Sequence, residues 1–409
     1  MRALRAYFHF ELLRRYNRIV IGDRSFTMQE VNTLVPVSYD DAAGWIVSEC
    51  DAVIPSLPKT YLGTEKGEVA RVTKGMAMAL KARMLLYAAS PLNNPGGDAA
   101  RYLEAAAAAK ELIDAGIYKL VSEETTNNAD AQGLIYGKWC PVSSDFEAAN
   151  FPVGFEGGNS GVCPSQNLAE AFDMATGEPF DWNDESMRSR MFVASARDPR
   201  FARTLIYNGA TFKGQSVQSY VGGRNGRPLD GATPTSYYLR KHIVEATSFV
   251  TGSEMSYQHI FPFFRYAEVL LNYAEALAAA TQNPDFTGMK GEVEYTLSPR
   301  EALNAVRARY NMPGITETDY AAFVKRLRNE RRVELAFEGH RFWDIRRWKI
   351  GAETTKVYGL TITPQNDGSF SYVRSVIQQR GWDDRMNYYP IADAELFKNH
   401  NLVQNDGWK

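Results

Sequence analysis

The first third of the chain has the hydrophobic spacing of amphipathic helices. Apolar residues recur at intervals of three and four, and Pro58, Pro91 and Gly116 each follow such a run as a stop signal. Later runs repeat this period, and several carry alanines on one face, which suits close helix pairing. The predicted helices cover residues 2–16, 39–56, 69–89, 98–115, 264–281, 299–310 and a stretch that begins at 319.

The order of these helices predicts a mainly α-helical fold. Successive helical hairpins are compatible with a tetratricopeptide-like scaffold, whose repeat is about 34 residues. Between Lys119 and Pro262 the helical period is lost, and Gly, Asn, Ser, Thr and aromatic residues dominate. We therefore expect a helical part over 1–118, a long irregular loop-rich insertion over 119–262 and a second helical part over 263–409, with a shorter irregular stretch at 354–383.

The insertion is the expected ligand face, because loops held by a rigid scaffold usually carry binding surfaces. It also contains short runs with strand character, such as Thr204 to Tyr207 before an Asn-Gly turn signal. Loop character nevertheless outweighs strand character across this part of the chain.

Charged residues interrupt the apolar face of the last predicted helix. The face that carries Phe323 and Leu327 continues to Arg331 and Glu334. Because an unpaired buried charge is very costly, this pattern predicts a partly buried network of paired ions. Its expected members are Glu330, Arg331, Glu334 and Arg341. We expect them to brace helices, so that Glu334→Ala would lower the melting temperature and leave ligand affinity unchanged.

The charged run RNERRVELAFEGHRFWDIRRWK (328–349) closely resembles the C-terminal signature of the SusD/RagB family. Six further stretches match that family in order along nearly the whole chain: LRAYFHF (4–10), ASPL (89–92), DPRF (198–201), FPFFRYAEVLLNYAEA (261–276), YYPI (388–391) and NLVQN (401–405). Members of this family are surface glycan-binding lipoproteins of Bacteroidetes-type bacteria. The resemblance implies non-catalytic binding of an oligosaccharide at the outer membrane and its delivery to a TonB-dependent transporter of the SusC type.

The N-terminus differs from the pattern of the family it resembles. Family members begin with a secretion signal, a lipid-acceptor cysteine and further helical sequence ahead of the stretch 4–10. This chain opens directly in an amphipathic helix and has no run of about 18 apolar residues. We therefore expect the family's N-terminal region to be missing from this sequence, and surface localisation follows from the resemblance alone.

The composition of the chain argues against some classes of binding partner and site. The 409 residues carry a formal net charge of −2 and no basic tract, which disfavours nucleic acid as a partner. Three cysteines, Cys50, Cys140 and Cys163, are too few and too scattered for a disulfide framework or a cysteine metal site. The expected partners are an oligosaccharide and the SusC-like transporter.

Aromatic residues of the insertion are the candidate sugar platforms, since flat rings can cover the C–H faces of sugars while amides and charges meet the hydroxyls. In the resembled family, binding aromatics often lie within the tens of residues before the stretch 261–276. A polar turn after the third predicted helix supplies one amide. The candidate glycan-binding residues are Tyr220, Tyr237, Tyr238, Phe249, Trp182 and Asn94. For each of them, ordinary packing of a loop onto the scaffold is the alternative interpretation.

Catalysis has weaker support. Glu330 and Glu334 lie one helical turn apart and could pair as in a glycosidase. The adjacent Arg331 would hold these carboxylates ionised, whereas a general acid needs a raised pKa. Asp181 and Asp184 near a tryptophan are a more exposed alternative, and no metal, nucleophile or phosphate motif is present.

We therefore predict no catalytic residue, no metal ligand and no cofactor. The alternative function is that of a peptide- or protein-binding helical solenoid without glycan specificity.

Overall fold

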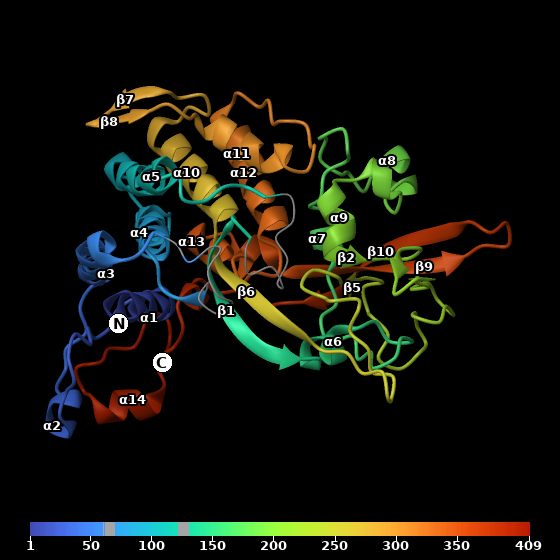
Figure 1. The fold of residues 1–409 in the computed structure, drawn as a ribbon, viewed down its shortest axis with the longest axis horizontal. Coiled ribbons are helices and arrows are strands. Elements are labelled where there is room, and N and C mark those ends of the chain that lie inside the picture. The colour runs from blue at the N-terminus through green and yellow to red at the C-terminus, as the bar shows by residue number, and fades with distance from the viewer. Residues whose placement is uncertain (60, 62–69, 122–130) are drawn as a thin grey trace.

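A series of packed helices forms the scaffold. The computed structural model describes residues 1–59, 61, 70–121 and 131–409. Each helix of the series packs against the next one in the chain. Helices α5 and α10 also pack against each other, although the insertion separates them in sequence (Figure 1). The helices of this series are α1 (Arg2–Tyr16), α3 (Tyr39–Val53), α4 (Lys74–Ala89), α5 (Ala99–Asp114), α10 (Tyr266–Thr281) and α11 (Pro299–Ala308). The mainly helical prediction is compatible with this architecture.

Side-chain caps explain where several of these helices begin. Thr73 caps α4 by accepting a hydrogen bond from the backbone N–H of Met76, and Asp98 caps α5 in the same way. Ser298 and Glu301 form a complete capping box at the start of α11. The predicted helix starts near residues 98 and 299 therefore agree with the structure because the capping side chains could be recognised in the sequence.

Small residues allow the central helices to approach closely. Ala105, Ala106 and Ala109 of α5 are almost fully buried, as are Ala274 and Ala278 of α10. Alanine loses little side-chain entropy on burial and adds little bulk, so paired helices can lie close together. These faces belong to the larger of two main hydrophobic cores.

The insertion leaves and rejoins the scaffold through a two-stranded antiparallel ribbon. Strand β1 (Leu134–Ser143) pairs with β6 (Tyr257–Arg265), with Leu134 opposite Arg265 and Ser143 opposite Tyr257. The expected boundary between residues 262 and 263 thus falls inside β6. Between these strands lie only short elements: α6 (Asp145–Asn150), α7 (Gln166–Ala169), α8 (Glu185–Ser189), η3 (Ala194–Ala196), α9 (Pro199–Thr204), β2 (Leu205–Ile206), β3 (Thr211–Phe212), β4 (Gln215–Ser216) and β5 (Tyr238–Leu239).

A long hairpin occupies the stretch 354–383, which the sequence interpretation took to be irregular. Strands β9 (Lys356–Pro364) and β10 (Phe370–Gln379) pair antiparallel and extend beyond the body of the molecule (Figure 1). The prediction was wrong here, although Leu360 and Ile362 are buried and the threonines beside them are exposed. That alternation is the ordinary signal of a half-buried strand.

A second core joins the insertion to the C-terminal part of the chain. Phe151, Phe172 and Phe201 of the insertion pack in one cluster that also contains Val333 and Ile362. Because the C-terminal part supplies buried members of this core, the insertion is anchored on a helix and a hairpin that follow it in sequence.

The C-terminal part completes the molecule. Helix α12 (Tyr320–Glu334) packs on α10, and α13 (Arg341–Arg347) follows it. The remaining elements are α2 (Met28–Val31), η1 (Ile54–Ser56), β7 (Gly288–Lys290), β8 (Val293–Tyr295), η4 (Gly351–Thr354), η5 (Asp384–Asn387) and α14 (Asp393–Lys398). Within the residues described, no helix is both long and apolar enough to cross a membrane.

Candidate functional site

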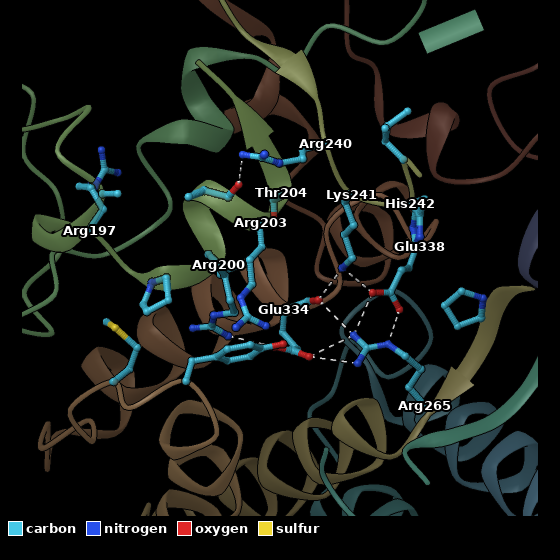
Figure 2. Close-up of a pocket in the computed structure, with 18 of the residues that line it drawn as sticks. Arg197, Arg200, Arg203, Thr204, Arg240, Lys241, His242, Arg265, Glu334 and Glu338 are labelled. Carbon is cyan, nitrogen blue, oxygen red and sulfur yellow. Dashed lines mark hydrogen bonds and ion pairs between the residues drawn. The ribbon is translucent and has the colours of Figure 1, made fainter. Parts of the chain in front are cut away.

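A cavity of about 1100 Å³ lies where the insertion meets the scaffold. The insertion contributes α9 and the loop 240–246, and the scaffold contributes β6, the loop after α11 and the end of α12. Figure 2 shows Glu334 beside Arg200 and Arg203, and Glu338 beside Lys241 and His242, with Arg265 joined to both carboxylates. Ligand pockets of small molecules usually span about 300–1000 Å³, so this cavity has room for a small oligosaccharide.

Two carboxylates of the C-terminal signature organise the cavity wall. Glu334 accepts hydrogen bonds from Arg265 at 3.1 Å and from Arg200 at 3.0 Å, and it also pairs with Arg309. Glu338 accepts from Nε of Arg265 at 2.7 Å and from Nζ of Lys241 at 2.6 Å. One network therefore links α9, β6, α12 and the loop 240–246 (Figure 2).

These carboxylates stay ionised. Burial by itself would raise the pKa of Glu334, but the attraction of Arg309, Arg265 and Arg200 outweighs it and holds that pKa well below its ordinary value. In the same way Arg265 and Lys241 overcome burial and lower the pKa of Glu338 to about 2. Neither group can act as a general acid near neutral pH, because such an acid must still carry its proton there.

The loop 240–246 places further polar groups on the cavity. Arg240 binds Glu245 through Nε at 2.9 Å and Nη2 at 2.6 Å, which fixes its guanidinium group. Burial and the neighbouring Lys241 lower the pKa of His242 to about 4, so its ring is neutral at pH 7. This part of the wall offers fixed cationic donors and a neutral imidazole.

The balance of charge around the cavity is positive. Six arginine and lysine residues line it against three glutamates, and the apolar remainder includes Leu134, Ile260 and Pro262. The ring of Tyr310 also lines it, but the guanidinium groups of Arg200 and Arg203 lie 5.1 and 5.5 Å from its centroid. The cavity is thus built to donate hydrogen bonds to a polar ligand rather than to stack on a sugar ring.

The ion network of α12 extends beyond the cavity. Glu330 binds Arg307 at 2.8 Å and also pairs with Arg200. On the next face, Arg331 donates to Asp344 at 2.8 Å and to Asn272 at 2.5 Å. These contacts join α12 to α9, α10, α11 and α13.

Arg341 does not belong to this network, contrary to the expectation from sequence. Across the described residues its side chain makes no hydrogen bond or ion pair. The nearby Asp344, which could have paired with it, instead binds Arg331 and Arg347, the latter at 2.9 Å.

Two of the predicted glycan-binding tyrosines lie in the second core. Tyr237 is 1% exposed and its hydroxyl donates to Gln166 at 2.7 Å, while Tyr238 is fully buried and its hydroxyl donates to the carbonyl of Asn225. A ring without exposed surface cannot cover a sugar. The structure therefore contradicts the assignment of both tyrosines to a sugar platform, and their role is packing.

Asn94 is also engaged internally. Its side-chain amide donates to the carbonyls of Ala89 and Asp98, and its Oδ1 accepts from the Asp98 N–H at 2.9 Å. With 6% of its surface exposed, it closes the loop between α4 and α5 and has no free amide group for a sugar.

The other three predicted aromatics are half-buried and pack against the second core. Trp182 lies beside Arg188, Tyr220 stacks at a tilt on Phe370 at 5.2 Å, and Phe249 meets Phe151 edge to face at 5.7 Å. None of the six predicted residues lines the cavity. Trp182, Tyr220 and Phe249 remain candidates because each keeps part of its side-chain surface exposed.

Sequence reasoning missed the cavity residues of the loop 240–246. Arg240, Lys241 and His242 belong to no motif that marks a binding or catalytic site in the sequence. No local pattern shows that these residues face Glu338, which lies 97 residues after Lys241. Among described residues there is also no group of three or more His, Cys, Asp and Glu side chains that could hold a metal ion.

The packing role of Tyr237 gives a direct test. Tyr237→Phe removes a buried hydroxyl and leaves Gln166 without that donor, so we expect the free energy of unfolding to fall by about 1–2 kcal/mol. Urea denaturation measures the change. Tyr220→Phe is the matched control, since its half-buried hydroxyl makes no hydrogen bond within the described structure. Equal stability of both variants would contradict the assignment.

Comparison with known proteins identifies the family of the chain. A family model described as the SusD family matches residues 122–408. A SusD-like protein P2 from Formosa agariphila is 33% identical over 146 residues, which cover 35% of this chain and 24% of that relative. The chain thus aligns with only about a quarter of the length of this curated relative.

Solved structures of similar proteins have the same fold over 98–100% of this chain. A SusD-like protein from Bacteroides fragilis superimposes with a TM-score of 0.80 at 27% identity, covering 100% of this chain and 79% of that one. A SusD-like carbohydrate binding protein from the same organism gives a TM-score of 0.79 at 26% identity, covering 98% of this chain and 78% of that one. The match to the family model spans more than half of the residues and confirms the resemblance carried by the C-terminal signature. The chain belongs to the SusD family.

Proposed function

We propose that this protein binds an oligosaccharide at the outer surface of the cell, without cleaving it, and passes it to a SusC-like TonB-dependent transporter. Membership of the SusD family supports this function, as does the similarity to a protein named for carbohydrate binding. We also interpret its helical hairpins as tetratricopeptide-like units that hold the binding region rigid.

We propose the cavity between insertion and scaffold as the binding site. The observation that carries this assignment is the ion network that fixes its donors. Lys241 and Arg265 are held by Glu338, and Arg240 is held by Glu245. Donors that are already ordered lose little conformational entropy when they bind a hydroxyl-rich ligand.

The state of two cavity carboxylates supports the proposal that the ligand is bound without cleavage. Retaining and inverting glycosidases use one carboxyl group that is protonated and one that is ionised. At this site the arginines keep both Glu334 and Glu338 ionised. We therefore expect a bound glycan to be recovered intact after prolonged incubation, as measured by chromatography of the ligand.

A blocking substitution tests the location. Ala246 is exposed and lines the cavity, so Ala246→Trp should fill its mouth at little cost in stability. After a glycan-array screen identifies a ligand, calorimetry should show affinity weakened at least about tenfold, since a tenfold loss needs only about 1.4 kcal/mol. Ala321→Trp, at an exposed position of α12 away from the cavity, is the matched control.

Other outcomes are equally informative. Loss of binding in Trp182→Ala or Tyr220→Ala, with normal binding in Ala246→Trp, would place the site on the exposed aromatics and overturn the cavity assignment. Binding of peptides alone, with no glycan retained, would overturn the proposed function.

A further inference from the structure

Arg328, Arg332 and Arg341 are half-buried arginines whose side chains make no ion pair in the described parts of the chain. At 3.6 residues per turn, Arg328 and Arg332 lie one turn apart on the side of α12 opposite Glu334 and the cavity. The guanidinium carbon of Arg328 lies 4.9 Å from the centroid of the Trp348 ring.

Helix α13 brings Arg341 to the same place. Two side-chain contacts join α12 to the segment 344–348 in opposite chain directions: Arg331 binds Asp344 at 2.8 Å, and the guanidinium group of Arg328 lies over the ring of Trp348. In this alignment the end of α12 that carries Arg332 meets the start of α13, where Arg341 is the first residue. The three arginines are therefore near one another: burial and the charge of Arg341 lower the pKa of Arg332, and burial and the charge of Arg328 lower that of Arg341.

Three of the buried arginines each have a carboxylate partner. Arg83 binds Glu268, Arg307 binds Asp173 and Glu330, and Arg347 binds Glu275 and Asp344. A desolvated guanidinium without an acidic partner is costly, and pairing offsets that cost. Among the described residues, Arg197 is also buried without a carboxylate partner, but backbone carbonyls accept its hydrogen bonds, whereas the side chains of Arg328, Arg332 and Arg341 have neither kind of acceptor.

The acidic residues around the three arginines do not neutralise them. Glu170 is held by Arg374 at 2.6 and 3.1 Å, and Asp344 is shared by Arg331 and Arg347. Glu353 of η4 is exposed and makes no side-chain hydrogen bond or ion pair within the described chain. The local balance of charge is positive.

Solvent still reaches these guanidinium groups. None of their nitrogens is among the buried atoms that lack a hydrogen-bond partner, so each keeps some accessible surface. Burial and the nearby Arg341 lower the pKa of Arg332 to about 9, which shows that the two cations feel each other. A bound anion would offset the repulsion between the two cations.

We propose that Arg328, Arg332 and Arg341 form a binding site for an oxyanion, that is, a sulfate, phosphate or carboxylate group. Planar guanidinium groups bind such oxygens through paired, charge-assisted hydrogen bonds. The oxyanion is either a free ion or an acidic group on a saccharide, and both present the same oxygens. This site is separate from the cavity and does not depend on the proposed function.

Calorimetry with sodium sulfate tests the site, with sodium chloride holding the ionic strength constant. The unaltered protein should bind sulfate saturably, and Arg332→Met should weaken that affinity at least about tenfold, the loss expected when one charged hydrogen-bonding group is removed. Arg18→Met is the matched control, because Arg18 is exposed at the end of α1 and its side chain makes no ion pair in the described residues. Its sulfate affinity should equal that of the unaltered protein.

Melting curves without sulfate separate loss of the site from loss of the fold. Arg332→Met should melt at or above the melting temperature of the unaltered protein, since it removes one of three neighbouring cations. Arg341→Met is the second variant, with the same expected melting behaviour and the same expected loss of sulfate affinity. The same calorimetry with glucose 6-sulfate, and with glucose as the uncharged control, tests whether the anion belongs to a sugar. Tighter binding of glucose 6-sulfate than of sulfate identifies an acidic sugar as the ligand. Equal binding of the two identifies a free ion. No saturable binding of sulfate by the unaltered protein, or equal affinities in Arg332→Met and Arg18→Met, would overturn the proposal.

Discussion

Glu334→Ala is expected to lower the free energy of unfolding by about 3–5 kcal/mol, the usual cost of breaking a buried ion pair from one side. The side chain of Glu334 is 2% exposed and faces Arg200, Arg265 and Arg309. Its removal leaves part of this buried positive charge without its acidic partner. Urea denaturation followed by circular dichroism measures the loss.

Glu353→Ala is the matched control, because Glu353 is exposed and its side chain makes no ion pair in the described chain. It should change stability by less than about 0.5 kcal/mol, as is usual at the surface. A loss below about 1 kcal/mol in Glu334→Ala would contradict the bracing role. Since Glu334 also lines the cavity, the expectation from sequence that ligand affinity would stay unchanged is revised: we now expect weaker binding, because Arg265 loses one of its two carboxylate partners.

Stability should fall steeply in acid. The carboxyl groups of Glu268, Glu275, Glu334 and Glu338 all have pKa values below the ordinary one, because their arginine or lysine partners outweigh burial. In the unfolded chain these groups take up protons near pH 4.3. Below that pH the unfolded state binds more protons than the folded state, so stability falls as the pH drops towards about 2.

Two histidines raise the pH at which stability begins to fall. Burial lowers the pKa of His242 to about 4 and that of His340 well below its ordinary value. Both are neutral in the folded protein and take up a proton near pH 6.5 when it unfolds. The expected profile is flat above pH 7, declines from about pH 6.5 and steepens below about pH 4.5.

Urea midpoints measured from pH 8 to pH 3 check this profile. The slope of the unfolding free energy against pH reports the difference in bound protons between the two states. In Glu338→Gln the slope below pH 4.5 should be shallower than in the unaltered protein, because one low-pKa carboxyl group is gone. Stability that stayed constant from pH 6 to pH 3 would contradict the assignment.

Local signals carried the prediction of the long helices. The helix over 2–16 and the start of the one over 299–310 agree with α1 and α11, because the period of apolar residues and the capping side chains act within a few residues of each other. The hairpin β9–β10 was readable in the same way, from Leu360 and Ile362, and was overlooked in a stretch rich in turn residues.

The roles of the aromatics could not be predicted in this way. A tyrosine in a loop has the same local sequence whether its ring lies in a core or in solvent. Tyr237 is buried because Gln166, which lies 71 residues before it, accepts its hydroxyl, and because Phe192 packs on its ring. Tyr220 keeps partial exposure on the neighbouring part of the insertion.

The sequence by itself determined the family, through the run 328–349, and it determined that Glu330, Arg331 and Glu334 must have partners, because buried charge is too costly to stand alone. Only the tertiary structure decided which partners they have. Arg200 and Arg265 reach Glu334 from 134 and 69 residues away, whereas Arg341, in the same run, finds no carboxylate among the described residues. The physical reason is that the cost of burial acts on each residue, while pairing depends on which distant elements the fold brings within about 3 Å of it.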